Sequence, residues 1–249
     1  MSGHSKWHSI KHKKGALDAK RGKLFTKHAK LITIAARDGG GDVSMNPGLR
    51  TAIANAKADN VPNSNIDKAV KKGTGAGKDD VHFMELMYEG FGPAGTALYV
   101  SVITDNKNRS VANVKTCFAK NGGNMGAAGS VGWMFDRKGM ITMPLGAKDA
   151  EEAEMEIIDA GADDLSLDDG IFEVITDPSE LMNVKDKLEA SGFTAEKAVI
   201  TYLPKDEIEI DNIEDARKIL KLIEAIEDDE DVNEVYGNFN IIDEILEQL

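Results

Sequence analysis

Residues 83–104 read FMELMYEGFGPAGTALYVSVIT, and this stretch decides the fold class of the 249-residue chain. Apolar and aromatic residues lie on both sides of the Gly-Pro-Ala-Gly run at 92–95. Two runs of this kind around a Gly/Pro turn predict strand, turn and strand. A helix is expected to follow, capped by Asn108 and ended by the two glycines at 122–123.

Further strands and helices alternate from here to the C-terminus. WMFDRKGMITM at 133–143 is expected to form a hairpin with Gly139 in its turn. Residues 177–180, Asp-Pro-Ser-Glu, form a capping box that should open a helix over 178–190. Such split βαβ units are typical of ferredoxin-like sandwiches, and the length fits two of them. The other predicted elements are helix 149–160, strand 171–176, strands 197–203 and 207–210, a long helix capped by Asn212 with Asp215, strand 232–238 and a short terminal helix.

The upstream residues 18–73 show helical periodicity. Of three predicted helices, the second opens at Asn46-Pro47 and the third at Val61-Pro62, and Gly73 closes the third. These patterns predict an α+β multidomain chain, with an N-terminal three-helix bundle ahead of two ferredoxin-like α/β domains. In the first helix, which ends at the glycines of 39–41, the predicted inward face is Leu24, His28, Leu31 and Ala35, with Phe25, Ile32 and Ala36 beside it.

The charge of the chain is distributed unevenly. The formal net charge is −13, yet residues 1–78 hold 16 Lys+Arg against 5 Asp+Glu, while residues 79–249 hold 14 against 38. Asymmetry of this kind indicates interaction with nucleic acid. The alternative is that the basic and acidic parts neutralise each other across a domain contact.

Composition excludes several classes of protein. The single cysteine, Cys117, excludes an intrachain disulfide and a zinc site built on several cysteines. No apolar run reaches the roughly 20 residues that span a bilayer. The basic N-terminus lacks the hydrophobic region of a secretory signal. These features favour a cytoplasmic protein with no membrane partner.

Residues 4–14, HSKWHSIKHKK, permit two interpretations. Histidines four residues apart would share one helical face and could bind zinc. The first carboxylate is Asp18, however, so these histidines have no second-shell partner, and the lysines between them would repel a dication. Residues 1–37 hold ten basic side chains against one acid, which favours phosphate binding instead. Trp7 could then stack on an exposed base.

The predicted nucleic-acid-binding residues extend from this arm into the helical bundle. Lysine and arginine neutralise phosphates without reading base sequence, and a histidine beside a phosphate can take up a proton. No catalytic residue, metal site or cofactor is predicted. The set is His4, Lys6, Trp7, His8, Lys11, His12, Lys13, Lys14, Lys20, Arg21, Lys23, Lys27, Lys30, Arg50, Lys57, Lys68, Lys71 and Lys72.

Two glycine-rich stretches resemble nucleotide-binding motifs without matching them. GTGAGK at 73–78 has three residues, not four, between its first glycine and the Gly-Lys pair, and Asp79 follows where a P-loop needs Ser or Thr. GGNMGAAGSVG at 122–132 lacks the G-x-G-x-x-G spacing and follows a helix. The second stretch is either a structural turn or a partner-binding loop. As a partner loop, its contact residues would be Asn124, Gly126, Gly129 and Ser130.

The sequence offers little support for catalysis. No serine lies in a G-x-S-x-G motif. Cys117 lies near Val114 and Phe118 on an apolar helix face, so it is expected to be a buried hydrophobic residue. The competing classes of function are a metal-dependent hydrolase and a protein adaptor whose acidic domains bind a basic partner.

Seven motifs give the chain a resemblance to the YebC/PmpR family over essentially its whole length. Members are named as probable transcriptional regulators, and the family includes the mitochondrial translational activator of cytochrome c oxidase. One departure is Ala94, which stands where a second glycine is common in the family. The motifs are GHSKW (3–7), IKHKKGALDAKRGKLFTK (10–27), NPGLRTAI (46–53), NIDKAVKKGTG (65–75), YEGFGPAGTALYV (88–100), TDNKNRS (104–110) and GNMGAAGSVGWMF (123–135).

The resemblance implies an N-terminal helical domain and two α/β domains, one inserted in the other. It implies no enzyme activity and no cofactor. It also implies contact with nucleic acid, which is DNA for the transcriptional members. Other members resemble ribosome-associated factors, which would bind ribosomal or transfer RNA and relieve stalling at proline runs. The choice between DNA and RNA stays open, and a monomer is expected. The implied domains are 1–78, 79–131 with 206–249, and the insertion 132–205.

Overall fold

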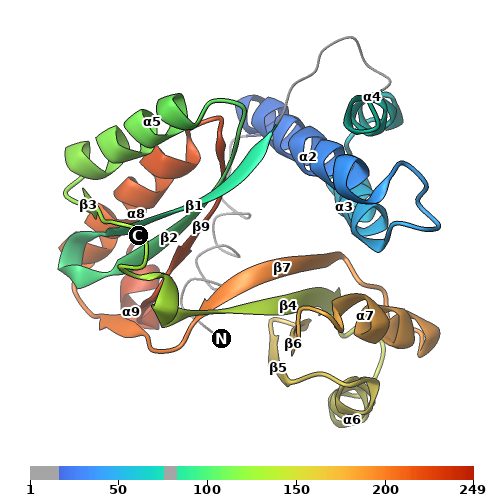
Figure 1. Cartoon of the computed structure of the whole chain (residues 1–249). Helices are drawn as coiled ribbons and strands as arrows, with labels where there is room; N and C mark the ends of the chain where they lie inside the picture. The colour runs from blue at the N-terminus through green and yellow to red at the C-terminus, as the bar shows by residue number, and fades with distance from the viewer. Residues whose placement is uncertain (1–16, 76–82) are drawn as a thin grey trace. The chain divides into compact units, whose positions relative to one another are not determined.

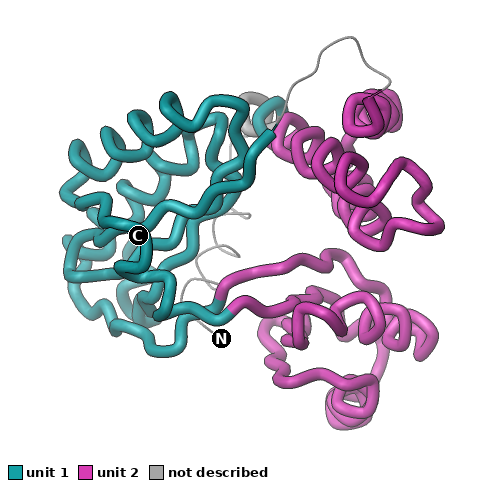
Figure 2. The backbone as a smooth tube through the Cα atoms, viewed as in Figure 1, with its two compact units in different colours: residues 1–23, 81–136, 203–249 teal, residues 24–80, 137–202 magenta. Residues whose placement is uncertain are grey.

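The structure is a computed structural model in which two compact units make up the described chain (Figure 2). Each unit combines segments that are far apart in the sequence, and one ferredoxin-like α/β domain is inserted in the other. The description covers residues 17–75 and 83–249, with side chains from residue 22 onward. The first unit contains residues 17–23, 83–136 and 203–249, and the second contains residues 24–75 and 137–202.

A four-stranded antiparallel sheet frames the first unit (Figure 1). β1 (Met84–Phe91) and β2 (Ala97–Thr104) are joined by a 3-10 turn over Pro93–Gly95, so the predicted strand, turn and strand are confirmed. The sheet order is β3-β1-β2-β9, with β3 (Asn124–Met125) and β9 (Val232–Gly237) at its edges.

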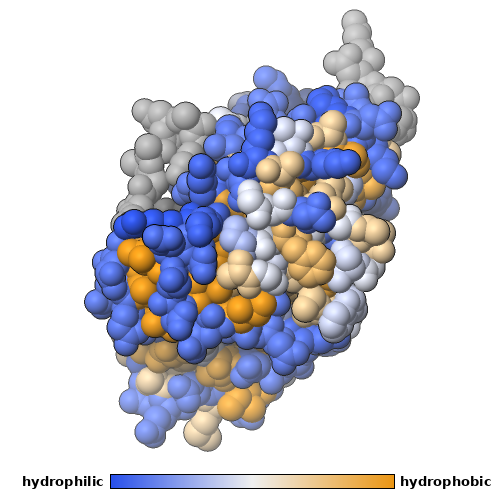
Figure 3. All heavy atoms as spheres, turned by 90° about the vertical axis from the view of Figure 1, so that its left-hand side faces the viewer, coloured by the Kyte–Doolittle hydropathy of each residue, from blue (hydrophilic) through white to orange (hydrophobic). Residues whose placement is uncertain are grey.

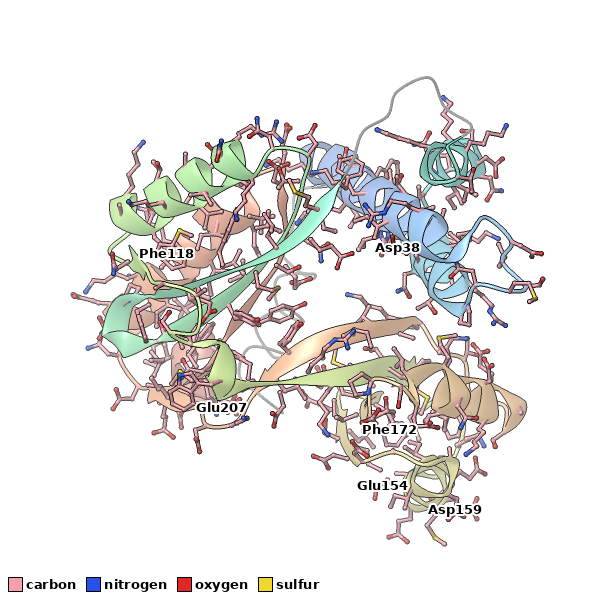
Figure 4. The ribbon with its side chains drawn as sticks, in the orientation of Figure 1. Asp38, Phe118, Glu154, Asp159, Phe172 and Glu207 are labelled. Carbon is pink, nitrogen blue, oxygen red and sulfur yellow. The ribbon has the colours of Figure 1, made fainter. Side chains whose placement is uncertain are left out.

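Helices α5 (Lys107–Lys120) and α8 (Ile213–Glu227) cover one face of this sheet and close its core (Figure 1). Leu98 and Val100, two residues apart on β2, point to the helices and are fully buried. Phe118 of α5, labelled in Figure 4, is fully buried in the same core. The period of two in the strand and of 3.6 in the helices brings the apolar face of each element together.

The cap of α5 lies two residues before the predicted one. Asn106, not Asn108, is the N-cap, and its side chain accepts a hydrogen bond from the backbone N–H of Arg109 at 3.1 Å. Thr104 fixes this start, because its hydroxyl accepts the backbone N–H of Asn106 at 3.0 Å. The Asn-x-Asn sequence offers two possible N-caps, Asn106 and Asn108. The hydrogen bond between Thr104 and Asn106 favours the first.

The C-terminal segment adds a parallel strand pair and a terminal helix to the first unit. β8 (Ile208–Ile210) pairs in parallel with β10 (Phe239–Ile241), and α9 (Asp243–Leu246) follows. The sequence predicted β8 and the terminal helix but not β10. The buried Asn238 divides β9 from β10, because its side chain accepts the backbone N–H of Ala97 at 2.6 Å.

The inserted domain has the βαββαβ order of a ferredoxin-like fold. Its sheet order is β5-β6-β4-β7, and β6 pairs antiparallel with both β4 and β5. Its core joins the sheet to both helices and includes Phe172 of β6, labelled in Figure 4. The elements are β4 (Phe135–Pro144), α6 (Ala150–Ala160), β5 (Asp164–Asp168), β6 (Ile171–Thr176), α7 (Leu181–Ala190) and β7 (Lys197–Pro204).

The hairpin predicted around Gly139 is wrong, because β4 continues unbroken through that residue. Gly139 pairs with Thr176 of β6 and has no positive φ. A Cβ atom at this position would collide with the hydroxyl of Thr176 and lie 3.0 Å from the Cβ of Leu181. The glycine therefore serves close packing of β4 against its neighbours, and not a turn.

The start of α7 also differs from the prediction. Residues 177–180 form a turn, and the helix begins at Leu181. Asp177 accepts hydrogen bonds from the hydroxyl and the backbone N–H of Ser179, at 2.5 and 2.8 Å, and these two bonds lower the pKa of Asp177. The carboxylate is thereby occupied by a local turn, so the predicted capping box does not form.

The N-terminal bundle consists of α2 (Leu17–Gly39), α3 (Pro47–Ala58) and α4 (Asn63–Gly73), as predicted. Its core includes the fully buried Ile32 of α2. The predicted inward face of α2 is rotated, since Leu24 is 36% exposed. Ile32 and Ala36, which the sequence placed beside that face, are buried in the core, while Ala35 of the predicted face packs against the core and His28 is buried.

Candidate nucleic-acid interface

The predicted basic arm lies largely outside the described residues. Its members there are His4, Lys6, Trp7, His8, Lys11, His12, Lys13 and Lys14. Lys20 and Arg21 belong to α2, but their side chains are also outside the described set. The structure therefore describes eight of the predicted contact residues, all in the helical bundle: Lys23, Lys27, Lys30, Arg50, Lys57, Lys68, Lys71 and Lys72.

The three described lysines of α2 are held by the protein itself. The Nζ of Lys23 donates to a carboxylate oxygen of Asp228 at 2.9 Å and to its carbonyl oxygen at 3.0 Å. Lys30 is buried, with 9% of its surface exposed, and Lys27 is half-buried. Sequence periodicity could not show this, because the partners come from other parts of the fold.

Helices α3 and α4 present the accessible basic side chains. Arg50 and Lys57 lie seven residues apart on α3, and both are exposed. Lys68 and Lys71 are exposed on α4. Within the described part of the chain, none of these four side chains forms a salt bridge. We name Arg50, Lys57, Lys68 and Lys71 the basic quartet.

The local sequence explains why α4 presents its lysines outward. Ile66 and Ala69 are buried in the bundle core, and Lys68 and Lys71 fall on the opposite side of the helix. Lys71 also lies in the last turn, where a cation interacts favourably with the helix dipole. The helix dipole is therefore a structural reason for Lys71 that requires no ligand. The exposed pair Lys68 and Lys71 can also bind phosphates.

The glycine-rich loop at 122–132 is built around a buried carboxylate. Glu89 on β1 is 8% exposed, and its oxygens accept the backbone N–H groups of Gly129, Val131 and Gly132 at 2.7, 2.6 and 2.7 Å. The N–H of Gly126 donates to the carbonyl oxygen of Glu89 at 2.7 Å. The loop therefore has a structural organisation that its sequence did not reveal, since Glu89 lies forty residues away.

Burial and hydrogen bonding have opposite effects on the pKa of Glu89. Burial raises the pKa, while the backbone N–H groups of Gly129, Val131, Gly132 and Ser130 lower it, and the net effect is a lowered pKa. The carboxylate is therefore charged at neutral pH. Its bonds to the loop are charge-assisted and strong.

Two further loop residues stand out in the structure. The indole of Trp133 is 66% exposed, and its N–H donates to the carbonyl oxygen of Ser130 at 3.2 Å. The hydroxyl of Ser130 is buried and has no hydrogen-bond partner in the described part of the chain. The sequence placed Trp133 in a strand, so its exposure was not predicted. Asn124, Gly126, Gly129 and Ser130, the proposed contact residues, lie in this same loop.

The TDNKNRS motif at 104–110 forms a partly buried ion-pair network around the buried carboxylate of Asp231. Arg109 donates through Nε and Nη2 to Asp231, which is 4% exposed, at 3.0 and 2.7 Å. The hydroxyl of Thr104 donates to the same carboxylate at 3.0 Å, and Ser110 shares a 2.8 Å hydrogen bond with Tyr88. This motif therefore joins β2 and α5 to the segment before β9.

The described residues contain no group of three side chains able to hold a metal ion. Cys117 is half-buried; burial raises the pKa of its thiol, and its sulfur donates to the carbonyl oxygen of Ala225 at 3.3 Å. A thiol in that state is a weak nucleophile. Over the same residues, no helix is both long enough and apolar enough to cross a bilayer.

Family models match most of the chain. The model described as "TACO1/YebC protein N-terminal domain" matches residues 5–76, and "TACO1/YebC second and third domain" matches residues 83–239. A relative from Fusobacterium nucleatum is 49% identical over 249 residues, and one from Halothermothrix orenii is 47% identical over 251 residues. Each match covers all of this chain and at least 99% of the relative, and both relatives are named "Probable transcriptional regulatory protein".

A solved structure has the same fold. The crystal structure of a conserved hypothetical protein from Aquifex aeolicus is similar with a TM-score of 0.85 at 43% sequence identity. The similarity covers 93% of this chain and 95% of that one. The architecture is therefore shared with an experimentally solved protein across nearly the full length of both.

Proposed function

The chain belongs to the TACO1/YebC family, and from that premise we propose that it is a regulatory protein that acts by binding nucleic acid. Its relatives are named as probable transcriptional regulatory proteins, which supports DNA as the ligand. The binding region is residues 1–78, and it combines the basic arm with the basic quartet. No chemical reaction is part of this function, and it needs no cofactor.

The observation that carries this proposal is a set of accessible cations in a strongly basic segment. Residues 1–78 hold 16 Lys+Arg against 5 Asp+Glu, and in the described part of this segment the basic quartet is exposed and unpaired. Each phosphate that such a side chain neutralises releases a counterion, so affinity falls as salt rises. The acidic remainder of the chain is repelled by phosphate, which orients the basic segment toward the ligand.

RNA is the second candidate ligand, and the composition of the basic segment favours it. Thirteen of its basic residues are lysine and three are arginine. Arginine, asparagine and glutamine read base edges in duplex DNA, whereas lysine mainly contacts phosphates. Binding dominated by phosphate suits ribosomal or transfer RNA, as in a translation factor. A cytoplasmic monomer fits either ligand.

The test is the salt dependence of binding to labelled duplex DNA and to RNA of equal length. Replacing the basic quartet by glutamine should weaken binding and reduce the slope of log K against log salt by about 3 to 4 for duplex DNA, at roughly 0.9 per phosphate contact. Deleting residues 1–16 should weaken binding and flatten the salt dependence further.

Lys115 and Lys120, which are exposed on α5, provide the matched control. Their double replacement by glutamine removes exposed charge from a helix outside the proposed interface, and it should leave the slope almost unchanged. If the quartet variant and the arm deletion both bound like the wild type, the basic segment would not be the contact. Tighter binding to RNA at equal salt would favour the translation role.

A further inference from the structure

Trp133 is the most exposed aromatic side chain among the described residues. The residue is 66% exposed, whereas Phe91, the next in exposure, reaches 39%. An exposed tryptophan ring forgoes the favourable free energy of burying its apolar surface, and large exposed rings often mark binding sites.

The segment that carries Trp133 is held in place before any ligand arrives. Glu89 binds three N–H groups of the loop, the last of them from Gly132, the residue directly before the tryptophan. The indole N–H is itself bonded to the carbonyl oxygen of Ser130. A side chain fixed at both the backbone and the ring edge loses little conformational entropy on binding.

The group of this loop that remains available to a partner is the face of the Trp133 ring, which can stack on a flat partner. The backbone N–H groups that could have cradled a phosphate are already donated to Glu89. Residues 122–134 contain no charged side chain. The indole N–H is also used, so the face of the ring is what remains for a partner. A flat, uncharged partner fits such a surface.

We infer that Trp133 stacks on an unpaired base of the bound nucleic acid, a contact that rests on the proposed function. Every base has a π-face, so stacking requires no particular sequence. Residues 83–136 carry four acids and four Lys+Arg, and the acidic excess of the first unit lies in residues 203–249. Residues 83–136 thus carry no net formal charge of their own. The backbone N–H of Lys205 donates to the carbonyl oxygen of Met134 at 2.9 Å, so the first acids of the 203–249 segment, Asp206 and Glu207, follow directly after a residue bonded to this loop.

Figure 3 shows apolar patches among hydrophilic residues on the face that corresponds to the left-hand side of Figure 1. Phe91 also lies beside the loop, since its backbone pairs with Asn124 across β1 and β3. It gives the first unit a second exposed ring at the start of the same loop.

The test uses the fluorescence of Trp133. The chain has two tryptophans, so Trp7→Phe leaves Trp133 as the single reporter. Titration with a labelled single-stranded oligouridine should quench this fluorescence, and an abasic strand of the same length should not. In the same background, Trp133→Ala should weaken binding about 5- to 150-fold, as for loss of one stacked base, whereas Trp133→Phe should restore most of the affinity.

Met155 supplies a control, because it is 67% exposed on α6 and lies in the other unit, so Met155→Ala should bind like its parent. Circular dichroism confirms that each variant is folded. An unchanged affinity for Trp133→Ala, with binding still lost in the quartet variant, would overturn the stacking contact alone. A parent protein that binds neither DNA nor RNA would overturn the proposed function itself.

Discussion

Ala94 adopts a left-handed backbone conformation, with a φ of 55°, in the turn between β1 and β2. Only glycine enters this region without a steric cost, because Cβ crowds the carbonyl oxygen of an L-residue. The resemblance to the family already marked position 94 as a common glycine.

Ala94→Gly should raise the free energy of unfolding by about 0.5–1 kcal/mol, because relief of the left-handed strain exceeds the added chain entropy of glycine. Urea denaturation followed by circular dichroism measures the change. Gly95 provides the reverse control. Its φ is 74° and its position has open space, so Gly95→Ala should destabilise through backbone strain alone. Equal stabilities for all three proteins would contradict the argument.

Glu89→Gln should lower the free energy of unfolding at pH 7 by about 2–3 kcal/mol, because charge-assisted bonds to three loop N–H groups are weakened. The folded-state pKa of Glu89 is lowered below its unfolded-state value by the backbone N–H groups of the loop. Its stabilisation is therefore present above that value and is lost as pH falls through the folded-state pKa.

Urea denaturation of wild type and variant over a series of pH values, from neutral to acid, measures this effect. The difference between the two proteins should shrink as the pH falls, because the protonated Glu89 of the wild type loses its charge. Glu85→Gln, an exposed acid on the same strand, serves as the control and should change little. A stability difference that is constant at all pH values would show that the Glu89 charge is not responsible.

At the scale of elements, Asn46 fixes the geometry between α2 and α3. It is buried, accepts the backbone N–H of Leu49 at 2.9 Å, and donates to the carbonyl oxygens of Ala35 and Gly40, both at 2.8 Å. The side chain thus satisfies groups at the end of one helix and the start of the next. The sequence predicted the N-cap role of Asn46 but not the two hydrogen bonds that its side chain donates to the end of α2.

Asn46→Ala should cost roughly 1–3 kcal/mol of stability, since it removes a cap and leaves the carbonyl oxygens of Ala35 and Gly40 without their side-chain donor. Asn46→Asp keeps the acceptor for the N–H of Leu49 but loses both bonds donated to Ala35 and Gly40. The stability of this variant therefore measures the contribution of those two donated bonds alone. Thermal unfolding of the three proteins measures both costs. If aspartate restored full stability, the bonds to Ala35 and Gly40 would be energetically unimportant.

The sequence predicted elements best where a local signal was unambiguous. Asn46 and Asn212 cap their helices as predicted, since each polar side chain lies directly before an apolar helical pattern. The hairpin prediction at Gly139 was wrong because a glycine required for tight packing cannot be distinguished, from sequence, from a glycine required for a turn. Lys23 and Lys30 remained in the predicted interface because a salt bridge to Asp228, or burial, depends on tertiary contacts.

At the scale of the whole molecule, three separate hydrophobic cores divide the chain. One lies in the helical bundle, one joins the segments around the inserted domain, and one lies within the inserted domain. The three-domain division of the sequence stays a proposal. A core that includes residues from β4, α6, β6 and α7 suggests that the insertion can fold independently.

Residues 135–204 should fold when expressed alone. The fragment keeps all six elements of the ferredoxin-like order, and its end strands β4 and β7 are neighbours in the sheet. At about 70 residues its stability should be low, roughly 3–5 kcal/mol. Cooperative urea unfolding and dispersed amide resonances would support the boundary. A disordered fragment would mean that the insertion needs the rest of its unit.

The split of the first unit has a consequence for the order of synthesis. β2 takes β9 as its edge partner, and α8 closes the core over β1 and β2. On a translating ribosome, residues 83–136 emerge roughly 100 residues before β9 is complete, which is about 5–20 s of elongation. During that interval the nascent first sheet lacks a strand and half of its cover. The inserted domain is synthesised completely before that, so it can fold while the surrounding domain still lacks α8 and β9.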